Sequence, residues 1–284
     1  MIVYRHRLRI IVVAVAVIIL ATMVRLAAPP EAVADAATVA TFAAVIALVV
    51  AFGISSLTER ILPTVPARTV HAPVHGRWLA MNSPATKVPS HGTRAYGQAH
   101  AIDLTAEPDG ITRPQFGDGP GFRSPEDFPA FGEPVHAMVA GTVVSASSRH
   151  RDHRSRSSYP ALLYMTIAAA ARELGGPGFV VGNHVTIRTD DGVFALVAHL
   201  QHESLRVQVG DQVRAGETIG ACGNTGNSSE PHVHAQLMDR RSLWSAQGLP
   251  MAFAGISVDG VAAADTMPAN DQHMVAPAPE ADSH

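Results

Sequence analysis

Two histidines, His232 and His234, stand one residue apart in the stretch EPHVHAQLMD, where apolar and polar residues alternate. Side chains two residues apart lie on the same face of a β-strand but not of a helix, so the spacing predicts that both imidazoles enter one site. Imidazole binds metal ions and transfers protons near neutral pH. The pair alone is weak support for such a site, because the 284 residues include fifteen histidines and an exposed strand would carry the same spacing.

Two more side chains of this chemistry lie in apolar, strand-like stretches. His199 closes the run VFALVA, and Asp103 lies in AIDLTAE. Because Cys222 is the one cysteine of the sequence, a metal site has to be built from histidine and carboxylate ligands. The chemistry open to these residues is metal ligation together with proton transfer.

Short β-like runs separated by glycine turns surround these residues. VHAMVAGTVVSAS (135–147) predicts two strands with a kink at glycine, and HVTIRTDDGVFALVAHL (184–200) predicts a hairpin that turns at Asp191-Gly192. LRVQVGDQVRAGETIGACG (205–223) adds three short pieces. This pattern predicts a mainly β domain over residues 96–250, built as a small two-sheet antiparallel β sandwich or barrel-like structure.

One segment interrupts the β pattern. Residues 149–178 begin as a charged loop and continue as a helix expected from Pro160 to Leu174, which two glycines end. The segment is typical of an insertion between strands. Four loop arginines could bind an anionic partner, although a solvated loop is the simpler interpretation: Arg149, Arg151, Arg154 and Arg156.

The first 57 residues predict a membrane hairpin of two transmembrane helices. Apolar runs cover about residues 9–28 and 36–57, and each is long enough to cross a bilayer. A cleaved signal peptide would also explain the first run, and a buried core helix would explain either one. Residues 58–95, rich in proline and small polar residues, predict a linker and the entry to the domain. Residues 262–284 predict a disordered tail.

Four stretches, taken in chain order, resemble the core of the lysostaphin-type (LytM-like) zinc metallopeptidases: VHAMVAGTVVSA, GNHVTI, VAHL and VQVGDQVRAGETIGACGNTGNSSEPHVHAQL. The resemblance covers residues 96–239, with the helical insertion breaking it. It implies that zinc is held by the histidine and aspartate of an H-x-x-x-D motif and by the second histidine of H-x-H. Carried over to this chain, Asp103 and His234 are zinc ligands, and His232 and His199 assist catalysis.

The chain departs from that family at the first zinc ligand. The position four residues before Asp103 is Ala99, and His100 is only three residues before it. Residues three apart on a regular strand point to opposite faces, so His100 could serve only if a β-bulge shifts the register. His91 is the other candidate, because a loop could fold it toward the site. We expect His91 as the third ligand, with His100 as the alternative.

The resemblance implies a membrane-anchored zinc metalloendopeptidase that hydrolyses peptide bonds of bacterial cell-wall peptidoglycan through a zinc-activated water. The alternative is a catalytically inactive domain of the same fold that binds cell-wall peptide or activates a partner hydrolase. A lipoyl- or biotinyl-type carrier domain would have a similar motif to VGDQVRAG, but this chain lacks the lysine in the turn that carries the acyl group. The net charge of −3 gives no indication of a nucleic-acid partner.

The location of the domain is predicted from two conflicting signals. Arg5, Arg7 and Arg9 favour a cytoplasmic N-terminus, and two crossings would then return the chain to the cytoplasm. A domain that acts on the cell wall has to lie outside. We therefore expect a cell-membrane protein with an extracytoplasmic domain. Either the hairpin inserts against the arginine bias, or the first run does not span the membrane.

Overall fold

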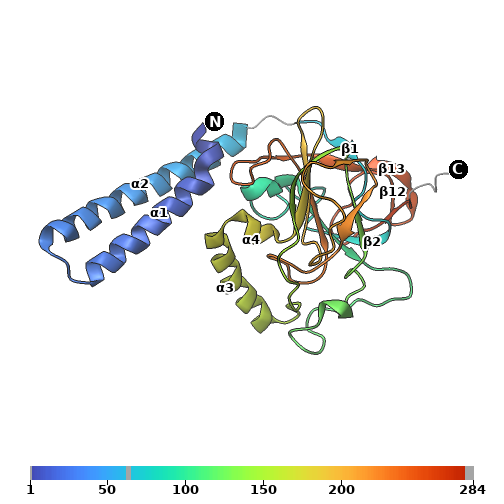
Figure 1. Ribbon diagram of the computed structural model, residues 1–284, viewed down its shortest axis with the longest axis horizontal. Coiled ribbons are helices and arrows are strands. Elements are labelled where there is room, and N and C mark those ends of the chain that lie inside the picture. Colours follow the sequence, from blue (N-terminus) through green and yellow to red (C-terminus); the bar gives the residue numbers. More distant parts are fainter. Residues whose placement is uncertain (1, 62–64, 279–284) are drawn as a thin grey trace. The chain divides into compact units, whose positions relative to one another are not determined.

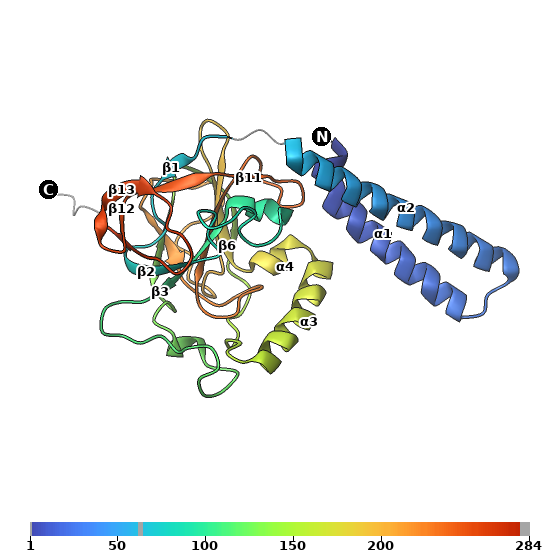
Figure 2. The same cartoon turned by 180° about the vertical axis from the view of Figure 1, so that it is seen from behind.

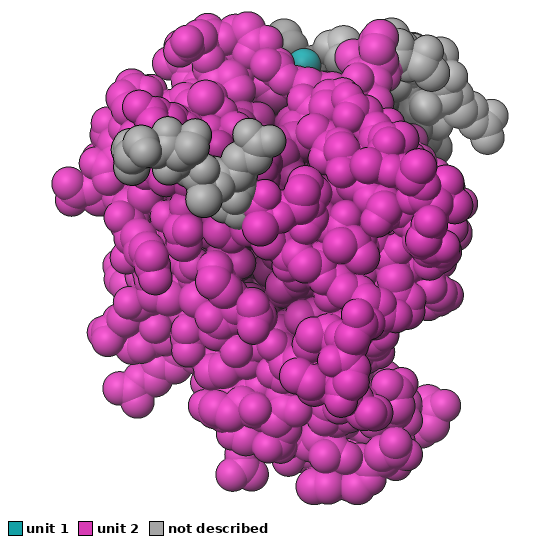
Figure 3. Space-filling view, turned by 90° about the vertical axis from the view of Figure 1, so that its right-hand side faces the viewer, with its two compact units in different colours: residues 1–64 teal, residues 65–284 magenta. Residues whose placement is uncertain are grey.

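The computed structural model of the chain describes residues 2–61 and 65–278. It consists of two compact units, residues 1–64 and 65–284, which Figure 3 colours separately. The first unit is helical and the second is mainly β (Figure 1).

The helical unit is a hairpin of two apolar helices, α1 (Ile2–Leu26) and α2 (Glu31–Ile61). Two prolines in the connection break the helix between them, and Glu31 lies in the first turn of α2, where a negative charge is favourable. The stretches Tyr4–Leu26 and Glu31–Ser55 are long and apolar enough to cross a membrane. The two predicted N-terminal apolar helices are therefore confirmed; a signal sequence would pass the same test of length and composition.

The β unit is built on one large sheet and one small sheet. Its strands pair in the order β1-β12-β14-β2-β3-β10-β7-β6-β5-β8, with β11 added to β10 and β13 to β12, while β4 and β9 form the small sheet. The strands are β1 (Arg68–Val70), β2 (Gly76–Met81), β3 (Ile102–Ala106), β4 (Pro134–His136), β5 (Gly141–Ser147), β6 (His184–Arg188), β7 (Phe194–Ala198), β8 (Gln212–Val213), β9 (Thr218–Ala221), β10 (Val233–Met238), β11 (Gly248–Leu249), β12 (Met251–Val258), β13 (Val261–Thr266) and β14 (His273–Ala276).

The predicted two-sheet, mainly β fold is confirmed, and its pairing is antiparallel apart from the parallel pair β1–β12. The barrel-like form is wrong, because the large sheet does not close on itself. Its end strands β1 and β8 are three and two residues long, and in the described chain each pairs on one side only. Two short 3₁₀ helices, η1 (Ala95–His100) and η2 (Pro125–Asp127), lie in the connections.

The hairpin predicted at residues 184–200 is formed by β6 and β7, in which Val185 lies opposite Val197. Gly192 occupies the turn with a φ of 85°, a conformation that glycine adopts without steric cost. Strand β7 continues the sheet into β10, and every residue of β10 is buried. These central strands are covered on both faces, so their apolar runs are nearly continuous.

The core also contains residues from outside the range 96–250. Trp78 on β2, Phe253 on β12 and Met274 on β14 are all buried in the main hydrophobic cluster. Strands β1 and β2 lie in the segment predicted to be a linker, and β13 and β14 lie in the segment predicted to be a disordered tail. The sheet thus extends beyond the predicted boundaries, because short strands gain their stability from neighbours distant in the chain rather than from local pattern. Residues 279–284 of the predicted tail are outside the described residues.

The insertion between β5 and β6 contains α3 (Tyr159–Gly175) and α4 (Pro177–Val181). Ser158 caps α3 by accepting a hydrogen bond from the backbone N–H of Ala161, and Gly176 ends it with a φ of 96°. The helix expected from residue 160 to 174 is therefore present. Figures 1 and 2 show α3 at the periphery of the β unit.

Candidate metal centre

Strand pairing brings four of the predicted site residues together. Asp103 on β3 lies directly opposite His234 on β10, and on the other side of β10 His234 lies opposite Ala198, the last residue of β7. Opposed residues of an antiparallel pair project to the same face within a few ångströms of each other. His199 follows Ala198 at once, and His232 precedes β10 on the face of His234. The central sheet therefore delivers one carboxylate and three imidazoles to one place.

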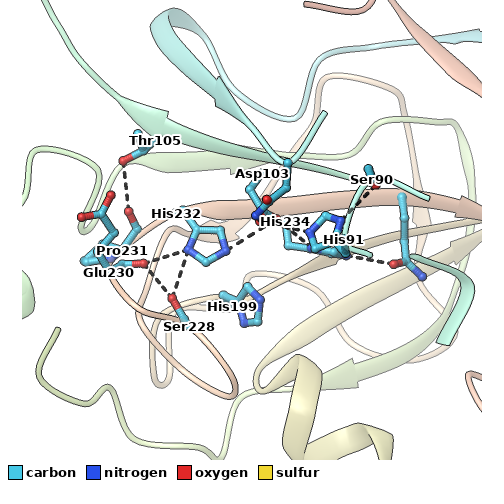
Figure 4. A network of polar contacts seen from close by, with 12 residues as sticks. Ser90, His91, Asp103, Thr105, His199, Ser228, Glu230, Pro231, His232 and His234 are labelled. Atoms are coloured by element: carbon cyan, nitrogen blue, oxygen red, sulfur yellow. Dashed lines mark hydrogen bonds and ion pairs between the residues drawn. The ribbon is translucent and has the colours of Figure 1, made fainter. Parts of the chain in front are cut away.

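His91 completes a cluster with Asp103 and His234 (Figure 4). One ligand atom from each of the three lies within 4.8 Å of the others. His91 Nε2 is 3.0 Å from Asp103 Oδ2, and His234 Nδ1 is 2.8 Å from Asp103 Oδ1. Asp103 and His234 are buried, and His91 is partly exposed. In the described part of the chain this is the one group of histidine, cysteine and carboxylate side chains that meets this distance.

The loop between β2 and η1 carries His91 to the cluster. A hydrogen bond of 3.0 Å from the Ser90 N–H to the Ala99 carbonyl closes this loop. His100 ends η1 and is not part of the cluster. His100 lies before β3, which begins at Ile102 and pairs without a register shift, so the bulged strand that would have brought His100 to Asp103 is not formed.

Gln236 fixes the tautomer of His234. Its side-chain N–H group donates to the Tyr96 carbonyl over 2.9 Å, so its Oε1 faces His234 Nε2 at 2.8 Å. An amide oxygen can only accept, which places a proton on Nε2 and leaves Nδ1 of a neutral ring with a lone pair. That lone pair points at Asp103 Oδ1.

Ser90 fixes the tautomer of His91 in the same way. The Ser90 hydroxyl donates to the Gln98 carbonyl over 3.1 Å and therefore accepts from His91 Nδ1, which lies 3.0 Å away. The proton of a neutral His91 is then on Nδ1, and the lone pair on Nε2 faces Asp103 Oδ2.

Two imidazole lone pairs and a carboxylate thus face one point, an arrangement that repels itself unless a cation lies among them. Two nitrogens and one carboxylate oxygen form a ligand set that zinc commonly takes, with a fourth position left for water. Second partners such as Gln236 and Ser90 are typical of metal-bound histidines, whose other ring nitrogen is usually hydrogen-bonded. The residues present therefore fit a zinc ion.

His199 and His232 stand beside this cluster and are held by main-chain carbonyls. His199 Nδ1 donates to the Thr225 carbonyl over 2.8 Å, and His232 Nδ1 donates to the Glu230 carbonyl over the same distance. Their Nε2 atoms remain available, and His232 Nε2 lies 3.6 Å from an Asp103 oxygen. The two rings are 4.7 Å apart, so both can reach a molecule bound at the cluster.

Burial and the neighbouring side chains together set the pKa values of these groups. Burial disfavours the Asp103 carboxylate, but His91, His232 and His234 together hold its pKa well below the usual range. Burial, with His232 and His234 nearby, lowers the pKa of His199 well below its usual value, so His199 is neutral. Burial lowers the pKa of His234, but the neighbouring Asp103 carboxylate and Gln236 outweigh burial and raise it.

Sequence reasoning did not identify the residues that support the cluster. Gln236 follows His234 by two positions, so strand periodicity could have placed it on the same face. Ser90 and Asn82, whose amide donates to Asp103 over 2.8 Å, lie in irregular segments that carry no such signal. Their roles depend on how the loop after β2 folds back over β3.

The cluster offers three side chains that could hold a metal ion, and two further histidines lie beside it. Residues 125–245 match the sequence model of peptidase family M23. This match, with the relatives described below, confirms the predicted resemblance to the lysostaphin-type peptidases. Asp103 and His91 precede the matched residues, so the fold rather than the match brings them to the site.

Curated relatives resemble a short part of the chain. It is 35% identical over 81 residues to the glycyl-glycine endopeptidase ALE-1 of Staphylococcus capitis, which is 28% of this chain and 22% of that protein. It is 36% identical over 81 residues to lysostaphin of Staphylococcus simulans, 28% of this chain and 16% of that protein. It is 49% identical over 53 residues to the DD-carboxypeptidase/endopeptidase Mpg of Neisseria gonorrhoeae, 19% of this chain and 12% of that protein.

The chain spans about a fifth or less of the length of these relatives. Among solved structures, the catalytic domain of lysostaphin from Staphylococcus simulans aligns with a TM-score of 0.31 at 19% identity, over 63% of this chain and 84% of that one.

Proposed function

We propose that this protein is a membrane-anchored zinc metalloendopeptidase that hydrolyses peptide bonds of bacterial cell-wall peptidoglycan. The observation that carries the proposal is that two ring nitrogens, His91 Nε2 and His234 Nδ1, converge on the Asp103 carboxylate. The names of two relatives, a glycyl-glycine endopeptidase and a DD-carboxypeptidase/endopeptidase, support a peptide as the substrate.

His91, Asp103 and His234 would hold the zinc ion. When bound, zinc supplies a Lewis acid that polarises a carbonyl and lowers the pKa of a bound water toward about 7. The protein supplies the proton transfers. The Nε2 atoms of His232 and His199 face the site while their Nδ1 protons are held by carbonyls. Each ring can therefore accept a proton from the attacking water at Nε2 and, once protonated, donate that proton to the leaving amine without turning.

His199 is held in an uncommon backbone conformation. Its φ is 62°, in the left-handed region that non-glycine residues rarely adopt. Such strain at a buried histidine is typical of functional sites, where the surrounding structure over-determines the conformation. The hydrogen bonds of His199 Nδ1 to Thr225 and of its backbone N–H to Val181 hold the ring in place.

The helices α1 and α2 would anchor the domain in the cell membrane, with the catalytic unit outside. Their large apolar side chains are exposed, among them Leu20, Phe42 and Val49, as lipid contact requires. Fusion of a reporter after residue 65 tests the orientation. A reporter active only in the extracytoplasmic compartment supports the proposal, and one active only in the cytoplasm contradicts it.

Metal content tests the proposed chemistry. The full chain, purified in detergent, should contain one zinc ion per molecule, and the substitutions Asp103→Ala, His234→Ala and His91→Ala should each remove it. His100→Ala is the matched control and should retain zinc. A folded protein that binds no zinc, or whose zinc is lost in His100→Ala but kept in His91→Ala, would contradict the proposal. The first of these results would favour the inactive, peptide-binding alternative.

A further inference from the structure

Helix α3 has its larger apolar side chains on the outside. Four of them recur along one face of the helix and define the α3 stripe: Tyr159 (80% exposed), Leu163 (65%), Ile167 (66%) and Leu174 (74%). Ala161 is the one buried residue of the seventeen in the helix. A helix of a globular domain normally turns its apolar stripe toward the core, so this one is the reverse of that pattern.

Aromatic side chains from the connection between β3 and β4 pack against α3 and add to its exposed apolar surface. Phe116 packs edge-on against Tyr159 with ring centroids 5.1 Å apart, and Phe122 packs in the same way against Tyr164 at 5.8 Å. Both phenylalanines are exposed. A contiguous exposed apolar surface of this kind marks a contact with a partner or a membrane.

The insertion that contains the α3 stripe carries mainly positive charge. Residues 149–175 contain five arginines against Asp152 and Glu173, a net charge of +3 in a chain whose total is −3. Arg149, Arg151 and Arg154 are exposed. An apolar and aromatic helix face in a segment of net positive charge has the composition of helices that lie in the interface of anionic bilayers.

The rest of the chain indicates the same partner. Two candidate membrane spans precede the β unit, and only residues 62–67 separate α2 from β1. Six residues extend at most about 20 Å. A unit tethered so closely to a bilayer meets the lipid surface at high effective concentration, so a modest apolar face is sufficient for contact.

We propose that the α3 stripe is a membrane-contact surface that lies in the interfacial region of an anionic lipid bilayer. This inference rests on the membrane anchoring in the proposed function and is independent of the metal chemistry. The contact limits how the tethered unit can turn at the membrane surface, so the insertion serves to orient the unit toward its substrate.

A fluorescent probe on the stripe tests the proposal. Cys222 is fully buried and is the one cysteine of the chain. An environment-sensitive, thiol-reactive dye added to the folded full-length protein should therefore label a cysteine introduced at an exposed position. Leu163→Cys carries the probe on the stripe. Val261→Cys, exposed on β13, is the matched control, and Phe52→Cys on α2 reports membrane insertion. The wild-type chain measures background labelling.

The labelled full-length proteins are reconstituted into vesicles of phosphatidylcholine with or without phosphatidylglycerol. In vesicles with phosphatidylglycerol, the probe at residue 163 should show blue-shifted emission and quenching by lipids that carry a nitroxide, while the probe at residue 261 should not. Combined Arg149→Glu and Arg151→Glu substitutions should reduce the quenching at residue 163 and leave that at residue 52 unchanged.

Three results would overturn the proposal. A solvent-like probe at residue 163 beside a quenched probe at residue 52 would refute the contact surface and leave the anchoring intact. Solvent-like probes at both positions would refute the anchoring as well. Shielding at residue 163 that persists in detergent and rises with protein concentration would assign the stripe to a second copy of the chain.

Discussion

The hydrogen bond between Gln236 and His234 offers a direct test of the metal centre. In Gln236→Met the side chain keeps its length and apolar stem but loses both of its polar atoms. His234 Nε2 then has no acceptor, and the Tyr96 carbonyl has no donor. Gln236 is fully buried, so water does not readily replace either contact.

The expected loss follows from the tautomer that Gln236 selects. Without Oε1 the buried ring gains by placing its proton on Nδ1, where Asp103 can accept it, and zinc binding must then displace that proton. Loss of a second partner of this kind lowers metal affinity by roughly 10- to 100-fold, or about 1.4 to 2.7 kcal/mol. The orphaned Tyr96 carbonyl should in addition lower the free energy of unfolding by about 1–3 kcal/mol.

Competition with a chromophoric chelator measures the zinc affinity, and circular dichroism checks that each protein is folded. Ser90→Ala is the matched control, since it removes the corresponding contact of His91, whose side chain is 13% exposed and can donate to water instead. Its affinity should fall by less than that of Gln236→Met. If folded Gln236→Met binds zinc as tightly as the wild type, or if Ser90→Ala loses more, the tautomer argument is refuted.

Three other substitutions test the remaining structure. His199→Asn should keep zinc but reduce hydrolysis by about 10²- to 10⁴-fold, because proton transfer is lost while the metal ligands stay. Zinc content and peptidoglycan hydrolysis, measured on one sample, distinguish loss of proton transfer from loss of the metal, and a loss of zinc would argue against this role. Phe253→Ala should lower the free energy of unfolding by about 3–5 kcal/mol in denaturant melts, since this fully buried ring joins β12 to the core; an unchanged midpoint would mean that residues after 250 fold separately. Burial, with His75, His71 and Arg206 nearby, lowers the pKa of His136 from 6.5 to about 4. The unfolded chain therefore takes up this proton first, so stability is complete above pH 6.5 and falls as the pH drops toward about 4. His136→Phe should flatten this slope in melts at several pH values, and a slope equal to that of the wild type would contradict the assignment.

The proposed site could be predicted in large part where its residues lie on regular strands. His234 lies on β10, His232 precedes this strand by one residue and lies on the same face, and Asp103 lies within the apolar run of β3. Period-two alternation is a property of the local backbone, so the sequence alone indicates which side chains share a face. The helical insertion was predictable for the same reason, since its cap and its terminating glycines are adjacent to the helix in the chain.

The sequence by itself therefore determined the mainly β character, the apolar helices and most of the candidate ligands. Only the tertiary structure decided between His91 and His100, because His91 lies in an irregular loop that a hydrogen bond from Ser90 to Ala99 folds over β3. It also decided the extent of the sheet. Strands β1, β2, β12 and β14 carry weak local patterns and are held by pairing with strands distant in the chain, and such pairing depends on the fold as a whole rather than on any short segment.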